Sequence, residues 1–142
     1  AESLVDLPAG TLAFPASRQA TLTGLADALA SGRVDLSPGA DREEARVRLA
    51  ALRGIGPWTV EVIAMRGLGD PDAFPASDLG VRAAAKQAGL PDNSRQLIEH
   101  SAHWRPWRAY ATQHLWTSLD HAVNQWPPLT INPSQSPQQE QA

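Results

Sequence analysis

The chain has 142 residues, 42% of them hydrophobic, and a formal net charge of −3. This length and composition are enough for one compact domain with one core. The absence of cysteine excludes disulfides, thiolate zinc sites and iron–sulfur clusters, and it is consistent with a reducing cytoplasm. No apolar run approaches the ~20 residues that a membrane-spanning helix needs, so we expect no membrane partner.

The negative charge is unusual for a protein that binds nucleic acid, because Lys and Arg supply most of the non-specific affinity for DNA. Any DNA contact must therefore rely on backbone dipoles or on residues outside this sequence. The first residue is alanine rather than methionine. We expect the chain to be the C-terminal part of a longer protein.

Helix signals follow one another along the chain, and no segment shows the alternation typical of a strand. The first predicted helix has Ser17 as its N-cap and stops at Gly32. The second follows Asp41, with Glu44 three residues later as in a capping box, and runs to about residue 52.

The second half of the chain predicts four more helices. Pro57 suits the first position of a helix that stops at Gly67. Asp78 stands at the start of the next, which ends near Gly89, and Asn93 or the residue after it caps a short helix through residue 100. The last runs from about residue 107 to about residue 124. Residues 1–126 thus form an all-α domain, and residues 127–142, rich in Pro, Gln and Ser, form a disordered tail.

Two glycines flank one apolar residue at Gly54-Ile55-Gly56, between the second and third predicted helices. Glycine lets the backbone reverse tightly, often with φ above zero, and Ile55 can insert between the helices. The N–H groups of Gly56, Trp58 and Thr59 would then point outward at a helix N-terminus, whose dipole favours an anion such as a DNA phosphate. The alternative is an ordinary glycine-closed connection.

Asp78 follows a proline-bounded loop and stands at a predicted helix start. One interpretation is an N-cap, because Asp is among the preferred residues there. The other is a catalytic carboxylate in a cleft beside the hairpin. Cleavage of an N-glycosidic bond builds positive charge on the sugar, and a nearby carboxylate stabilises that charge and helps to position water.

Three blocks of sequence, taken in order, carry a family resemblance. They are the hairpin L-R-G-I-G-P-W at residues 52–58, the segment P-A-S-D-L-G-V at residues 75–81, and a tryptophan-rich block at residues 103–116. Together they resemble the signature of the helix–hairpin–helix (HhH-GPD) DNA glycosylase superfamily. The third block is similar to that of bacterial 3-methyladenine DNA glycosylase II, and the similarity covers roughly residues 14–126.

The resemblance implies a role for residues of the second and third blocks. Asp78 matches the family's catalytic aspartate, and Trp58 and Trp116 match aromatic residues that line the base pocket. An aromatic wall suits a cationic alkylated base through stacking and cation–π attraction worth ~1–2 kcal/mol. The resemblance implies no cofactor for catalysis.

The first block matches the DNA-binding hairpin of the family. Its amides bind a DNA phosphate, and the carbonyls near its turn often hold a monovalent cation that bridges to DNA. The matching DNA-binding residues are Gly54, Ile55, Gly56 and Thr59. The matching carbonyls belong to Ala50, Leu52 and Ile55.

Bifunctional members of the family, which also cut the strand, carry a lysine nucleophile where this chain has Trp58. An indole has no amine that forms a Schiff base, and the only lysine, Lys86, matches no such role. The resemblance therefore implies a monofunctional base excision repair enzyme. It would remove alkylated purines such as 3-methyladenine from double-stranded DNA and leave an abasic site.

The other aromatic and basic residues of the third block also have purely structural interpretations. Trp107, at helical spacing from later apolar residues, is expected in the core or on the pocket floor, and Trp104 and Trp126 are expected to be structural. Arg105 and Arg108 either contact phosphate or lie on a solvated helix start.

Two alternatives to an active enzyme stay open. The chain could be a non-catalytic helix–hairpin–helix DNA-binding module, or a fragment that is inactive without its N-terminal half. Some bacterial glycosylases of this kind are fused behind an alkyl-transfer regulatory module, and we expect such a fusion in the parent protein. The expected location is the bacterial cytoplasm, at the nucleoid.

Overall fold

The computed structural model describes residues 4, 13 and 15–119, and every regular element in this part of the chain is helical. The elements are α2 (Ala16–Ala30), α3 (Arg42–Ala50), α4 (Pro57–Gly67), α5 (Leu79–Gln87), α6 (Ser94–His100), the 3₁₀ helix η1 (Ser101–Trp104) and α7 (Arg108–Thr117). The all-α prediction is confirmed for these residues. The predicted tail lies outside them.

Short polar side chains begin three of the helices, as the sequence predicts. Asp41, Asp78 and Asn93 are the N-caps of α3, α5 and α6, and each accepts a backbone N–H of the first turn. Gly32 and Gly89, with φ of 70° and 71°, follow α2 and α5 in the left-handed conformation that ends helices.

Three helix boundaries differ from the prediction. α2 begins at Ala16 with Pro15, rather than Ser17, as its N-cap, and no side chain caps it because proline has no side-chain acceptor. α3 ends at Ala50, since the N–H of Leu52 bonds three residues back and tightens the chain into the turn. α7 ends at Thr117, with Ser118 as its C-cap, rather than near residue 124. In addition, the short helix η1, which the sequence did not indicate, precedes α7.

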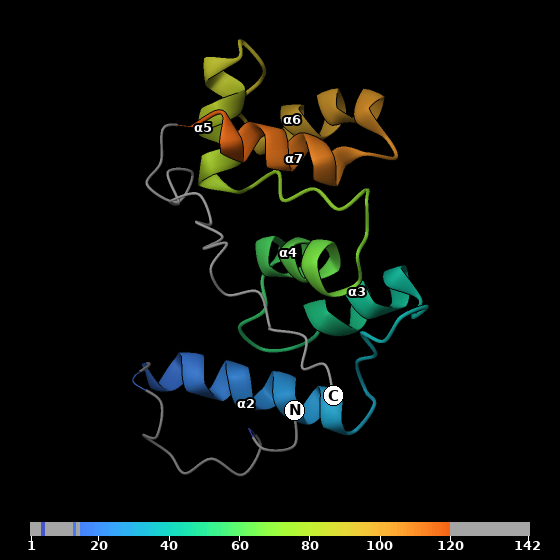
Figure 1. The fold of residues 1–142 in the computed structure, drawn as a ribbon. Coiled ribbons are helices and arrows are strands. Elements are labelled where there is room, and N and C mark those ends of the chain that lie inside the picture. Colours follow the sequence, from blue (N-terminus) through green and yellow to red (C-terminus); the bar gives the residue numbers. More distant parts are fainter. Residues whose placement is uncertain (1–3, 5–12, 14, 120–142) are drawn as a thin grey trace, which may run out of the picture.

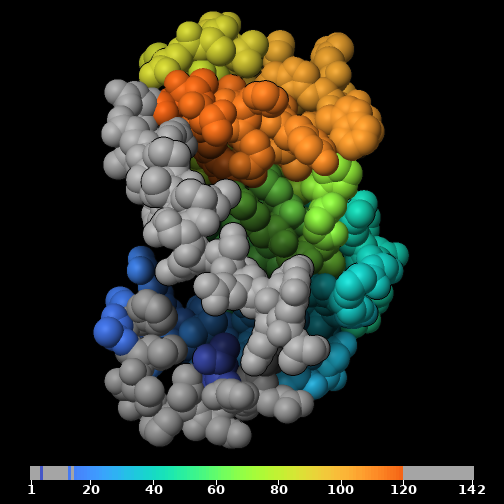
Figure 2. Space-filling view, in the orientation of Figure 1, coloured from blue at the N-terminus to red at the C-terminus, as the bar shows by residue number. Residues whose placement is uncertain are grey.

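The helices form two groups with α4 between them. α2 lies at one end of the molecule, α3 and α4 lie next to it, and α5, α6 and α7 gather at the other end (Figure 1). The space-filling view shows the green surface of α4 between the blue of α2 and the orange of α7 (Figure 2). A buried cluster of Ala28, Val34, Leu49 and Val60 joins α2 to α3 and α4. No helix of the described residues is long and apolar enough to cross a membrane.

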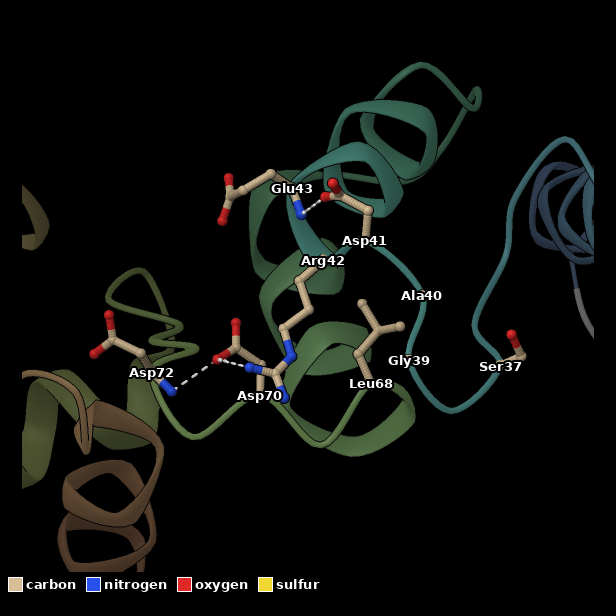
Figure 3. A pocket seen from close by; sticks show the side chains of 9 residues that line it. All are labelled: Ser37, Gly39, Ala40, Asp41, Arg42, Glu43, Leu68, Asp70 and Asp72. Atoms are coloured by element: carbon tan, nitrogen blue, oxygen red, sulfur yellow. Dashed lines mark hydrogen bonds and ion pairs between the residues drawn. The ribbon is translucent and has the colours of Figure 1, made fainter.

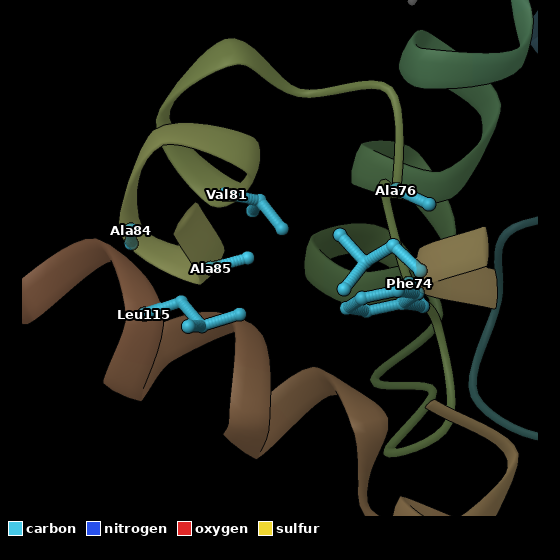
Figure 4. Close-up of a cluster of buried hydrophobic side chains, with 7 residues drawn as sticks. Phe74, Ala76, Val81, Ala84, Ala85 and Leu115 are labelled. Carbon is cyan, nitrogen blue, oxygen red and sulfur yellow. The ribbon is translucent and has the colours of Figure 1, made fainter. Parts of the chain in front are cut away.

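A second buried cluster fixes the chain that enters α5. Phe74 and Ala76, from the loop before the helix, pack with Val81 of α5 and Leu115 of α7 (Figure 4). All four side chains are at most 9% exposed. The loop before Asp78 is therefore part of the hydrophobic core rather than a free connection.

Two arginines tie the same loop, residues 68–78, to distant helices. On α3, Arg46 donates from Nε to Glu61 Oε1 at 3.0 Å and also pairs with Asp70. On α7, Arg108 forms a bidentate pair with Asp72, with both N–O distances at 2.7 Å. Such planar two-point pairs fix orientation as well as distance.

Asp70 is 7% exposed and stays charged. Burial alone would raise the pKa of its carboxyl, but the hydrogen bond from Arg46, the N–H of Asp72 and the nearby Arg42 together hold the pKa below its ordinary value. The pKa of Asp72 is lowered as well, chiefly by its hydrogen bond with Arg108. These carboxylates therefore stabilise the fold at neutral pH as ions.

The turn between α3 and α4 lies close to α2. Gly54 has a φ of 87°, and a Cβ at this position would lie 2.1 Å from Oγ1 of Thr21 on α2. Only glycine satisfies both the left-handed backbone and this contact. The hairpin turn is therefore a packing surface for α2.

Replacing Arg46 with alanine should lower the free energy of unfolding by about 3 kcal/mol, because Asp70 would remain buried without its main partner. The matched control is Arg48→Ala, which breaks an exposed pair with Glu44 and should cost below about 1 kcal/mol. Urea unfolding at pH 7 measures both. The folded pKa of Asp70 is lowered, so the stabilisation should be present above the unfolded pKa and disappear as the pH falls through the folded value. Equal losses in the free energy of unfolding for the two variants would contradict the conclusion that Arg46 anchors the loop.

Replacing Gly54 with alanine should destabilise the fold by more than about 1 kcal/mol, since it combines a left-handed backbone with a clash against Thr21. Gly39 provides the control: its φ is 92°, but nothing lies within 4 Å of its Cβ position. Gly39→Ala should therefore carry the backbone strain alone. Thermal unfolding of both variants measures the difference, and a smaller loss at Gly54 would show that α2 does not pack there.

Candidate active site

The hairpin turn leaves backbone donors open at the start of α4. Gly56 is the N-cap, with a φ of −93°, and no side chain caps the helix. Of the two hairpin glycines only Gly54 has a positive φ, while Gly56 has open space where a Cβ would lie. Ile55 packs against the cluster below, as its position predicts. The N–H groups of Gly56, Trp58 and Thr59 therefore lie at a helix end that an anion can approach.

The carbonyls before α4 form the other half of this turn. That of Leu52 accepts the N–H of Ile55 at 3.1 Å, whereas no backbone N–H of the described residues bonds to the carbonyls of Ala50 and Ile55. Carbonyl oxygens with free lone pairs are suitable ligands for a hard cation. Two of the three carbonyls that the sequence singled out, those of Ala50 and Ile55, are therefore free of backbone partners within the described residues.

Asp78 is held by three helices at once. Its Oδ1 accepts the N–H of Val81 on α5 at 2.9 Å and Nε1 of Trp116 on α7 at 2.9 Å. Its Oδ2 accepts Nε1 of Trp58 on α4 at 2.7 Å. The structure thus brings together three residues that the sequence singled out, and Trp58 connects them to the hairpin because it belongs to the first turn of α4.

These hydrogen bonds decide the charge of Asp78. Burial alone would raise the pKa of the carboxyl, but the indole of Trp116, the N–H of Val81, the indole of Trp58 and the N–H of Gly80 hold the pKa below its ordinary value. The side chain is therefore an anion at neutral pH. Asp78 is therefore the N-cap of α5 and at the same time the partner of the indoles, since its Oδ1 accepts from both Val81 and Trp116.

All the groups that bind the Asp78 carboxylate are electrically neutral. Among the described residues, none of the ion pairs involves Asp78. The guanidinium of Arg66 lies over the ring of Trp116, at 5.9 Å from its centroid, rather than in an ion pair with Asp78. No cationic side chain of the described residues therefore neutralises the charge of this carboxylate.

A pocket among the described residues lies elsewhere (Figure 3). It opens between the start of α3 and the loop that carries Asp70, and none of the hairpin amides, Asp78, Trp58 or Trp116 lines it. Arg42 crosses it toward Asp70, as Figure 3 shows. Asp70 and Asp72, the carboxylates that anchor the loop, therefore line this pocket, and it is separate from the carboxylate of Asp78.

Two expectations for the third block were wrong. Trp107 is 58% exposed and meets Tyr110 edge-to-face, so it is not part of the core. Arg108 does not lie on a solvated helix start, because its largely buried guanidinium forms an ion pair with Asp72. Trp104 is structural, as expected, and meets Phe74 edge-to-face at 5.8 Å.

Sequence reasoning missed the residues that support the site. Arg46, Glu61 and Asp70 form one network although 15 and 24 residues separate Arg46 from its two partners. The charged residues around Arg46 have the pattern of a solvated helix surface, and their spacing does not indicate that Arg46 pairs with Glu61 and Asp70. The signal that existed was local: Asp70 and Asp72 stand in a glycine- and proline-containing loop, beyond any helix they could cap.

No protein-family model matches the chain. Among curated proteins, it is 61% identical over 127 residues to a Mycobacterium tuberculosis protein described as a probable bifunctional transcriptional activator/DNA repair enzyme AlkA, covering 89% of this chain and 26% of that protein. It is 32% identical over 105 residues to DNA-3-methyladenine glycosylase 2 of Escherichia coli, covering 74% and 36%. The chain thus spans about a quarter to a third of these relatives.

Solved structures give the same family. A 3-methyladenine DNA glycosylase of Schizosaccharomyces pombe, in complex with abasic DNA, matches with a TM-score of 0.70 and 29% identity over 84% of this chain and 63% of that one. A DNA-3-methyladenine glycosidase of Bacillus halodurans matches with a TM-score of 0.70 and 27% identity, over 87% and 60%. With the hairpin, the carboxylate and these relatives in place, the chain belongs to the helix–hairpin–helix DNA glycosylase family.

Proposed function

We propose that this chain carries the catalytic site of a monofunctional DNA glycosylase that removes alkylated purines, such as 3-methyladenine, from double-stranded DNA. The observation that carries the proposal is the ionised carboxylate of Asp78, held between two indoles and paired with no cation of the described residues. Relatives named as DNA-3-methyladenine glycosylases, and one neighbour solved with abasic DNA, support the substrate class.

The chemistry needs a base outside the helix stack, because the glycosidic bond is inaccessible within a duplex. An alkylated purine already carries positive charge, so the bond electrons leave with the base and the charge passes to the sugar. The Asp78 carboxylate stabilises that oxocarbenium-like sugar. Water then bonds to the anomeric carbon and gives its proton to solvent, which leaves an abasic site.

A lyase step is not part of the proposal. The side chain that faces Asp78 from α4 is Trp58, and an indole nitrogen cannot form a Schiff base. Lys86, the only lysine of the chain, lies in the last turn of α5, whereas Asp78 caps the first, and it pairs with Asp92 at 3.6 Å. The product is therefore an intact strand with an abasic site.

The hairpin is proposed to grip the DNA backbone. The open N–H groups of Gly56, Trp58 and Thr59 would bind a phosphate, and the turn geometry of Gly54 and Ile55 presents them. This explains how a chain with a net charge of −3 could bind DNA without a basic surface.

A monovalent cation belongs to the same proposal. The carbonyls of Ala50, Leu52 and Ile55 would hold it, and when bound it would add positive charge beside the phosphate. This function places the protein at the nucleoid, in the bacterial cytoplasm. Because one relative is described as both a transcriptional activator and a repair enzyme, we also propose an upstream alkyl-transfer regulatory module in the parent protein.

Replacing Asp78 with asparagine should lower the single-turnover rate of base release by at least about 100-fold, because the negative charge opposite the sugar is lost. Asparagine is as good an N-cap as aspartate, so the fold should be retained. The matched control is Asp41→Asn at the N-cap of α3, which should leave the rate unchanged. The assay follows release of 3-methyladenine from duplex DNA, and circular dichroism checks helix content.

The outcomes of this assay separate the alternatives. Equal base release by the unchanged protein and Asp78→Asn would end the catalytic claim. DNA binding by both proteins without base release, in the parent protein as well as in this chain, would favour the non-catalytic DNA-binding module. Base release by the parent protein alone would show that this chain needs the residues its relatives carry beyond it.

A further inference from the structure

We propose that Trp58 and Trp116 are positioning residues: their indole N–H groups aim and fix the Asp78 carboxylate, a role separate from any contact that their rings make with the base. The inference rests on the proposed glycosylase function and assigns to the two tryptophans a part in the chemical step. A residue that only lines a base pocket needs its ring face, whereas this role needs its N–H.

The first argument is the number and origin of the donors. An N-cap needs a single bond from its carboxylate to the first turn, and Val81 supplies that donor. The two indole bonds, at 2.7 and 2.9 Å, are additional, and they come from α4 and α7. One donor occupies each side of the carboxylate, so the group cannot rotate about its terminal bond without breaking one of them.

The second argument is the charge of the donors. A lysine or arginine would fix the carboxylate equally well but would cancel most of its charge, as Arg108 does for Asp72. An indole N–H holds an anion while adding no net charge. The carboxylate is thus rigid and still fully negative, which is what stabilisation of a cationic sugar requires.

The third argument is how the indoles are themselves held. Trp116 packs against two buried clusters, one around α5 and one between α4 and α7. Residue 80 is a glycine, and a Cβ there would lie 3.3 Å from Cδ1 of Trp116 and 3.1 Å from Oδ1 of Asp78. The first turn of α5 therefore leaves room for the indole to reach the carboxylate. Trp58, 45% exposed, is the less constrained donor.

The charged groups on the helices around Asp78 are engaged elsewhere. On α4, Glu61 is bound by Arg46 and by the N–H of Phe74, and Arg66 lies over the Trp116 ring. On α5, Arg82 donates to the carbonyl of Asp92 and Lys86 pairs with its carboxylate. On α7, Arg108 binds Asp72, and His114 is exposed. We therefore expect the pKa of Asp78 to depend mainly on its neutral hydrogen-bond donors.

The direct test is an NMR measurement on the full chain, which needs no activity. The five tryptophans give five indole N–H signals, and Trp→Phe variants assign them. Asp78→Asn should shift the signals of Trp58 and Trp116 and leave those of Trp104 and Trp107 in place. In the unchanged protein, the same two signals should titrate together as Asp78 is protonated, below its ordinary pKa. The proposal would be overturned if the signals of Trp58 and Trp116 moved neither with Asp78→Asn nor with the protonation of Asp78.

The kinetic test replaces Trp58 with phenylalanine, which keeps an aromatic ring and removes the N–H. The single-turnover rate at saturating enzyme should fall by about tenfold or more, the value of one hydrogen bond to a charged group. Losing a donor to the ionised form raises the pKa of Asp78, so the acid limb of the pH–rate profile should move to higher pH. Trp116→Phe should act in the same direction. Trp107→Phe is the control, because the exposed Trp107 is not among the hydrogen-bond donors of Asp78.

The outcomes distinguish this inference from the proposed function. If Asp78→Asn is inactive but Trp58→Phe changes only the affinity for DNA and leaves the acid limb in place, the tryptophans are base contacts alone and the inference is wrong. If Asp78→Asn stays active, the proposed function fails, whatever the indole signals show. Because Trp116 is part of the core, Trp58→Phe keeps the test decisive even if Trp116→Phe does not fold.

Discussion

The structure depends on two buried ion pairs that fix one loop. Arg46 holds Asp70 and Arg108 holds Asp72, so the segment that leads to α5 is attached to α3 on one side and to α7 on the other. A buried pair of this kind adds little stability over an apolar equivalent, but it determines geometry, since a misplaced partner leaves an unpaired charge. Here it determines where α5 begins, and with it where the carboxylate of Asp78 lies.

The molecule uses its charges and its neutral donors for different purposes. Cationic side chains neutralise the carboxylates that anchor the loop, while the carboxylate at the head of α5 receives only backbone and indole N–H groups. The pKa of all three, Asp70, Asp72 and Asp78, is lowered. Only the last, however, has no cationic partner among the described residues.

Local patterns carried the prediction of the helices, and the family resemblance of three short blocks singled out Asp78, Trp58 and Trp116. N-caps such as Asp41, the glycine hairpin and the order of the three blocks lie in short stretches of sequence, and short-range rules are enough to read them. The partners of Arg46 and Arg108 could not be read that way, because pairs 24 and 36 residues apart are set by how helices pack. The indole bonds to Asp78 were missed for the same reason: sequence indicates an aromatic wall, but the direction of an N–H depends on the tertiary fold.

The distance along the chain between Asp78 and its last donor has a consequence for biosynthesis. The hairpin is complete by the end of α4, and its helices contact each other within one continuous stretch of chain. Trp116 follows Asp78 by 38 residues, and the Arg108 that fixes the loop follows Asp72 by 36. A chain emerging from the ribosome can therefore form its hairpin first, whereas the carboxylate gains its alignment only when α7 docks. A polypeptide released before that helix would carry the hairpin but an unaligned carboxylate.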